Sequence, residues 1–147
     1  MNVFQLDFNT RLQAWYEFRN KIKNKSVSEK CIEIDNFWQK CPIVNHYLHT
    51  DYVTDWPDPW VLLSENMYCN VAKALGICYT LLLTGVNDIK MVQAIDYNNE
   101  EVILVLVDNA KYILNYWPNT VVNNCLQDFT IKQTVNIDHI KTKIGAL

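Results

Sequence analysis

Three side chains, Cys69, His46 and His49, could do covalent chemistry together. A cysteine attacks a carbonyl carbon as its thiolate, and a neighbouring imidazole moves the proton that such acyl transfer requires. Both histidines precede the cysteine in the chain, so the fold has to bring one of them to it. The candidate chemistry is that of a cysteine hydrolase or acyl-transferase. The alternative is that Cys69 packs the second side of a helix, as a small buried cysteine commonly does.

The same histidines raise the question of a metal site, because Cys41, Asp51 and Asp55 lie near them in the sequence. Zinc accepts mixtures of imidazole, thiolate and carboxylate ligands. The spacing matches no established zinc pattern, however, and the segment lacks the helical period that would place both imidazoles on one face. The three glycines of the chain cannot build a phosphate-binding loop. We therefore expect neither a metal nor a cofactor.

A central helix is expected to carry Cys69, over residues 59–75. Asp58 is a good N-cap, Pro59 suits the first helical position, and Gly76 suits a left-handed C-terminal residue. An apolar stripe with spacings of three and four supports the helix, and it consists of Trp60, Leu63, Met67, Val71 and Ala74 or Leu75. Cys69 falls in the middle of this helix, opposite the stripe, where the helix dipole has little effect on a thiol.

Two further helices are expected before the central one. Asn9 or Thr10 caps the first, which runs to about Lys23, and Ser28 caps the second, which Pro42 terminates. Residues 43–58 show no clean period, contain Pro57 and three aromatic side chains, and are followed directly by Pro59. Trp and Tyr are enriched at interface anchors, so we expect a protein interface there. The candidate interface residues are Tyr47, Tyr52, Trp56 and Trp60.

The sequence after residue 76 changes to β-branched, apolar segments separated by Asn- and Asp-rich turns. These predict strands over 77–84, 89–97, 101–107, 111–117 and about 129–135. The expected fold class is α+β, with N-terminal helices and a central helix packed on a mainly antiparallel sheet. We expect a single domain over 1–147, made of N-terminal helices (1–42), an aromatic and proline-rich loop (43–58), and a helix-plus-sheet core (59–147).

Composition excludes several classes of protein. The net charge of −3 argues against a nucleic-acid groove, which needs clustered cations. No apolar run is long enough to span a bilayer, so no membrane partner is expected. Five cysteines without a Cys-x-x-Cys pair are typical of free thiols in a reducing compartment. The expected location is therefore the cytoplasm or an assembled virion.

The segment from Ala72 to Ile77, together with the pair EVILVLVDNAKYILN, resembles the core of transglutaminase-like (papain-like) proteins. In that family a helix leads into strands that are joined by a hairpin, and the resemblance covers roughly residues 58–117. It implies a cysteine in the first turns of the helix, a histidine on the next-but-one strand, and an aspartate at the end of the hairpin.

Counting along this sequence puts the family's cysteine near Val61, its histidine near Glu100 or Glu101, and its acid near Asn115 or Tyr116. None of these positions holds the expected residue, and no histidine lies between residues 50 and 138. The resemblance therefore implies a scaffold that has lost its triad.

The DWPDPW segment, the YC pair and the ALGI and YTL segments also resemble uncharacterised proteins of T4-like phages. With the triad missing, we expect a non-enzymatic structural or assembly protein, a phage virion component that contacts other proteins in a larger assembly. One alternative is a cysteine hydrolase or acyl-transferase that uses Cys69 with His46 or His49. Another is a small-ligand-binding host-defence antagonist that uses the pocket of the lost site.

Overall fold

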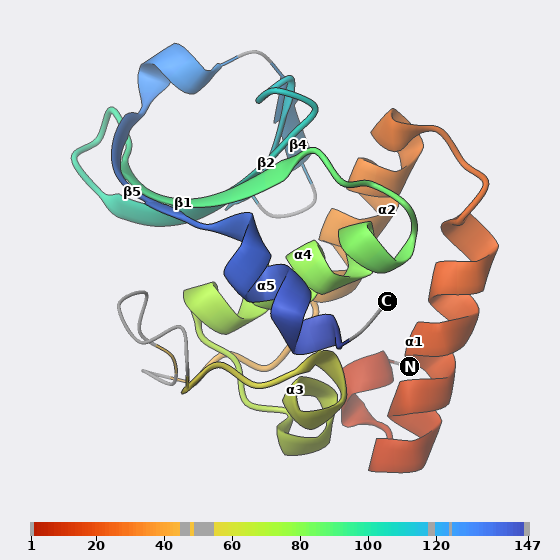
Figure 1. The fold of residues 1–147 in the computed structure, drawn as a ribbon. Helices are drawn as coiled ribbons and strands as arrows, with labels where there is room; N and C mark the ends of the chain where they lie inside the picture. The colour runs from red at the N-terminus through yellow and green to blue at the C-terminus, as the bar shows by residue number, and fades with distance from the viewer. Residues whose placement is uncertain (1, 45–47, 49–54, 118–119, 124, 146–147) are drawn as a thin grey trace.

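The computed structural model of this chain describes residues 2–44, 48, 55–117, 120–123 and 125–145. Within them, four α-helices precede a five-stranded antiparallel sheet, and one more helix follows it (Figure 1). This order confirms the predicted α+β class. None of the described helices is long and apolar enough to cross a membrane.

The two N-terminal helices begin one or two residues before their predicted caps. α1 (Phe8–Ile22) starts after Asp7, whose carboxylate accepts the Thr10 N–H at 2.9 Å. α2 (Val27–Trp38) starts after Ser26, whose hydroxyl accepts the Glu29 N–H at 3.2 Å. Each cap satisfies a backbone donor that has no partner inside the helix.

The predicted central helix over 59–75 is wrong, because the chain breaks it into two helices. Asp58 caps α3 (Pro59–Glu65) as predicted and accepts the Val61 N–H at 2.8 Å. Asn66 then adopts the left-handed conformation with φ 54°, which ends α3. The chain is not helical again until α4 (Asn70–Leu83). The predicted stripe breaks with it: Met67 lies between the helices, and both it and Trp60 are exposed.

The strand predicted over 77–84 is also wrong, because these residues continue α4. Almost every side chain of α4 after its first residue is buried, so its apolar run has no polar face. A helix that is buried on all sides has a continuous apolar sequence, and its hydrophobic period does not distinguish it from a buried strand. Gly76 lies inside α4 and does not end it. A Cβ at Gly76 would lie 2.6 Å from the Trp38 ring, so glycine permits the close approach of α2.

The hydroxyl of Thr80 joins three helices in the core. Its Oγ1 accepts the indole N–H of Trp15 in α1 at 3.0 Å and that of Trp38 in α2 at 2.9 Å. The same hydroxyl donates to the Gly76 carbonyl of α4 at 2.8 Å. Both indoles are almost completely buried, so this shared acceptor satisfies two donors that have no access to water.

The sheet has the strand order β4-β3-β2-β1-β5, and every neighbouring pair is antiparallel. Its strands are β1 (Ile89–Ile95), β2 (Glu101–Val107), β3 (Tyr112–Trp117), β4 (Thr120–Asn123) and β5 (Thr130–Val135). The strands predicted over 89–97, 101–107, 111–117 and 129–135 therefore match β1, β2, β3 and β5. Their local turn signals made them predictable.

Helices cover one face of the sheet. Figure 1 shows α2, α4 and the C-terminal helix α5 (Ile137–Ile144) on this side, where they contact the strands. The main apolar cluster lies between these layers. A smaller apolar cluster on the opposite face includes Val92, Leu104 and Ile113, and the segment that contains Leu126 packs against it. The sheet therefore separates two apolar clusters of unequal size.

Candidate functional site

Cys69 lies at the N-terminus of α4, not in the middle of a helix. It is the N-cap residue of α4, with extended backbone (φ −121°, ψ −176°), and no side chain caps this end of the helix. The preceding residue, Tyr68, forms an isolated parallel bridge with Ile43, and the Val44 N–H donates to the Tyr68 carbonyl at 2.6 Å. Cys69 therefore lies at the start of one helix, whereas Val61 lies in the first turn of another, α3.

Contacts from the N-terminal segment explain why the chain turns before Cys69. The Asn66 amide donates to the Phe4 carbonyl at 2.9 Å. The Arg11 guanidinium donates through Nε to the Leu63 carbonyl at 2.8 Å and through Nη2 to the Ser64 carbonyl at 3.3 Å. The two Arg11 bonds satisfy carbonyls at the end of α3 that a continuous helix would use internally.

The thiol of Cys69 contacts the backbone of Leu48. The Leu48 N–H lies 3.4 Å from Sγ, and Sγ lies 3.9 Å from the Leu48 carbonyl oxygen. Both residues are 6% exposed. His46 and His49, the predicted imidazole donors, lie outside the described residues, as do the metal candidate Asp51 and the interface candidates Tyr47 and Tyr52. In the sequence, His46 and His49 flank Leu48 on its two sides.

Asn115 of β3 contacts the same end of α4. Its amide nitrogen donates to the Ile103 carbonyl at 2.9 Å and lies 3.5 Å from the Asn70 carbonyl. Because both neighbours are carbonyl oxygens, the amide orientation is fixed, with nitrogen toward them. The Asn115 Oδ1 atom is buried and accepts no hydrogen bond from any described residue. A spare buried acceptor therefore lies beside the residue that follows Cys69.

Asp35 of α2 is the hydrogen-bond partner of the Asn115 backbone. Its Oδ1 accepts the backbone N–H of Asn115 at 3.0 Å and the side-chain amide of Gln39 at 3.2 Å. Burial raises the pKa of the Asp35 carboxyl, against the opposing effects of these two bonds and of Lys73. The Lys73 ammonium donates to the Gln39 Oε1 at 3.1 Å, and burial lowers the pKa of Lys73. Sequence reasoning missed the role of Asp35, although an aspartate beside apolar Cys31, Ile34 and Trp38 was a signal.

The other four cysteines comprise three buried thiols and one partly exposed thiol. All five are free thiols. Burial raises the pKa of Cys31 and of Cys41 to about 12, and it also raises the pKa of Cys78, which packs inside α4. These three thiols stay protonated at neutral pH. Cys125 is partly exposed and donates to the Asn123 carbonyl.

None of the described strands supplies an imidazole. Glu100 precedes β2 and Glu101 begins it, and both are exposed. His139, the remaining histidine of the sequence, is exposed on α5. Among the described residues, no group of three or more His, Cys, Asp or Glu side chains is placed to hold a metal ion.

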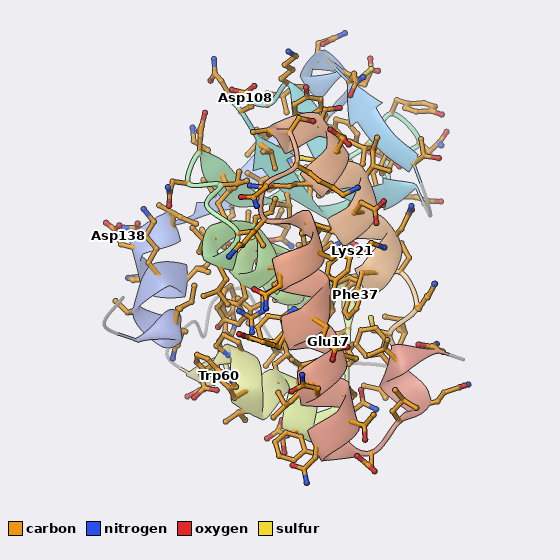
Figure 2. The ribbon with its side chains drawn as sticks, turned by 90° about the vertical axis from the view of Figure 1, so that its right-hand side faces the viewer. Glu17, Lys21, Phe37, Trp60, Asp108 and Asp138 are labelled. Atoms are coloured by element: carbon orange, nitrogen blue, oxygen red, sulfur yellow. The ribbon has the colours of Figure 1, made fainter. Side chains whose placement is uncertain are left out.

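The predicted interface residues separate in the structure. Trp56 is only 3% exposed and belongs to the main core cluster, so its side chain is not on the surface. Trp60 is 44% exposed and lies on the outer side of α3 (Figure 2). Asp55, a metal candidate, is exposed, whereas Cys41 is buried.

No known protein family matches the sequence, and no curated protein matches it. The structure is similar to solved structures of LapG from Legionella pneumophila. The calcium-bound form has a TM-score of 0.74 and 16% identity, and the match covers 89% of this chain and 77% of that protein. A second LapG structure has a TM-score of 0.70 and 15% identity, and covers 91% and 80% of the two chains. LapG is a cysteine protease of the transglutaminase-like fold.

These comparisons correct the expected function. The prediction of a non-enzymatic structural protein of a phage virion is wrong, because the similar structures are those of a cysteine protease. The resemblance to phage proteins receives no support either. Calcium binding is a property of LapG. The described part of the chain has the transglutaminase-like fold, with helices and a five-stranded antiparallel sheet.

Proposed function

We propose that this protein is a cysteine hydrolase or acyl-transferase with Cys69 as its nucleophile. The observation that supports the proposal most is the position of Cys69 at the start of α4, in a fold shared with a cysteine protease. Helix N-termini favour the thiolate form of cysteines. The N–H groups of the first helical turn also lack partners within the helix, and can bind an oxyanion.

Asn115 acts as the residue that orients the imidazole. Its unpaired Oδ1 can accept the N–H of an imidazole ring, which fixes the tautomer whose other nitrogen faces the thiol. The imidazole comes from His46 or His49, because these residues flank Leu48 and the Leu48 backbone contacts Cys69. This arrangement differs from the family's usual one, in which a strand supplies the histidine.

The reaction follows from these roles. The thiolate attacks the carbonyl carbon of an amide or ester, and the C=O electron pair moves to oxygen. As the intermediate collapses, the bond to the leaving amine or alcohol breaks, and the imidazolium donates its proton to that group. A thioester on Cys69 remains. Water or an acceptor amine then loses a proton to the imidazole, attacks the thioester, and releases the thiolate.

The test is the alkylation of Cys69 by iodoacetamide at pH 6 and pH 9, located by peptide mass spectrometry. At pH 6 we expect Cys69 to react at least about tenfold faster than Cys125, because only a thiol paired with an imidazole reacts quickly in acid. Cys125 is the internal control, and Cys69→Ser is the blank.

Variants then identify the imidazole. One of His46→Gln and His49→Gln should slow Cys69 at pH 6 and leave its rate at pH 9 little changed. An ester probe, p-nitrophenyl acetate, should leave an acetyl group on Cys69 in the parent. Equal rates for Cys69 and Cys125 at pH 6, or no effect of either histidine substitution, would contradict the proposal.

A further inference from the structure

We infer that Asp35 is a positioning residue for the candidate site, and that it acts by fixing the backbone and amide of Asn115. The inference rests on the proposed function, since it assigns a role within the same site. Asp35 lies on α2, far from Cys69 in the sequence, and it contacts neither the thiol nor a reacting atom. Its effect on Cys69 therefore has to pass through Asn115.

The backbone of Asn115 needs external support. Its φ is 68°, a conformation that non-glycine residues adopt rarely, although asparagine tolerates it better than most. The pairing of β3 with β4 shifts register between Ile113 and Trp117, so this ladder is irregular around Asn115. The Asn115 N–H donates to Asp35 Oδ1. Removing this acceptor would leave a buried donor without a partner.

A chain of hydrogen bonds passes through Asp35, and both of its ends lie on the first turns of α4. Lys73 donates to Gln39, Gln39 donates to Asp35, and Asp35 accepts from Asn115. The Asn115 amide then points back to the carbonyl of Asn70, the residue after Cys69. Three elements, α2, β3 and α4, are thus linked through the Asp35 carboxylate. A change at Asp35 alters the direction of the Asn115 amide without touching Cys69.

Burial supports a specific role for this carboxylate. Asp35 is fully buried, and its Oδ2 has no partner among the described residues, as is also true of Asn115 Oδ1. A buried carboxylate with one unpaired oxygen reduces stability compared with an apolar residue of similar size. The one oxygen that is paired is the one that holds Asn115.

A double-mutant cycle tests the inference, with the alkylation of Cys69 by iodoacetamide as the probe. Asp35→Asn keeps an acceptor oxygen, so we expect a rate at pH 6 within about threefold of the parent. Asp35→Ala removes the acceptor and should slow Cys69 by about tenfold at pH 6, with little change at pH 9. In an Asn115→Ala background, Asp35→Ala should have no further effect.

Lys30→Ala is the matched control. The Lys30 ammonium is also buried on α2 and also holds a backbone group, the Thr84 carbonyl at 2.6 Å, but it lies at the opposite end of α4 from Cys69. It should lower stability and leave the Cys69 rate unchanged. If Asp35→Ala does not fold, Gln39→Ala replaces it, because it frees the Asp35 carboxylate to rotate. Its smaller slowing should likewise vanish in the Asn115→Ala background.

Two contradictory outcomes can be told apart. If Cys69 of the parent reacts quickly at pH 6 but the Asp35 and Asn115 effects multiply, the proposed function stands and Asp35 has only a structural role. The same conclusion follows if Asp35→Ala leaves the rate unchanged. If Cys69 of the parent is no faster than Cys125, the proposed function fails and the inference fails with it.

Discussion

Asp35 shows how strongly the interior changes a single side chain. Its carboxyl is fully buried on α2, and burial raises its pKa above the ordinary value of 3.8. Two hydrogen bonds to its Oδ1 and the charge of Lys73 oppose this shift without cancelling it. The folded protein therefore binds the Asp35 proton more tightly than the unfolded chain does.

This difference predicts a pH dependence of stability. Because the native state holds the proton to higher pH, the contribution of Asp35 is full below the unfolded pKa, near 3.8, and is lost as the pH rises through the raised native value. Asp35→Asn removes the titration. The free energy of unfolding of the parent minus that of Asp35→Asn, from guanidinium titrations, should fall as the pH rises above about 4. A difference that rises instead would show that the native state favours the carboxylate.

At the scale of elements, the sequence predicted what local signals control. The strands β1, β2 and β3 are β-branched, apolar segments separated by short turns, and Asp58 and Pro59 mark the start of α3 correctly. The end of α3 was not predictable. Contacts of Asn66 with Phe4, and of Arg11 with Leu63, come from residues more than fifty positions away. A local period cannot contain that information.

The candidate site was predictable only in part, because it also depends on contacts between residues that are distant in the sequence. Cys69 was the candidate nucleophile of the alternative function only, and its place at a helix N-terminus depends on the break that the sequence did not reveal. Counting along the resemblance led to the region of Asn115. Asp35 was missed, because its partner Asn115 lies eighty positions away and no spacing rule connects them.

The approach of α2 to α4 gives a prediction for Gly76. Alanine favours helices over glycine, but a Cβ here would lie 2.6 Å from the six-membered ring of Trp38. Gly76→Ala should therefore destabilise the protein by about 1–3 kcal/mol in urea unfolding. Trp38→Phe removes the ring atoms that clash. It should cost less in the Gly76→Ala background than in the parent, and equal costs in the two backgrounds would refute the clash.

At the scale of the whole molecule, one hydroxyl holds the helical layer together. Thr80 accepts from Trp15 and Trp38, so α1, α2 and α4 meet at a single oxygen atom. The hydrogen-bond partners of this hydroxyl, Trp15, Trp38 and Gly76, all lie on helices, so the sheet does not contribute to this contact. The three-helix junction is thus a polar contact inside an apolar cluster.

Thr80→Val tests the junction with almost no change of shape. Both indole N–H groups lose their acceptor, so the free energy of unfolding should fall by at least about 2 kcal/mol. Thr84→Val is the matched control. Thr84 is the C-cap residue of α4, and its hydroxyl is also buried but only donates to the carbonyls of Thr80 and Leu81, so its loss should cost about 1 kcal/mol. Similar losses for the two variants would argue against the shared acceptor.

The break at Asn66 also has a consequence for the order of events during synthesis of the chain. The apolar period of Trp60, Leu63, Met67 and Val71 runs through the break, so the local sequence favours one continuous helix with Cys69 inside it. Distant contacts of Phe4 and Arg11 impose the interruption. Cys69 therefore reaches a helix N-terminus only once these contacts have formed. Because Phe4 and Arg11 precede the break in the chain, both are already synthesised when residues 59–69 emerge, so the break can form before the sheet does.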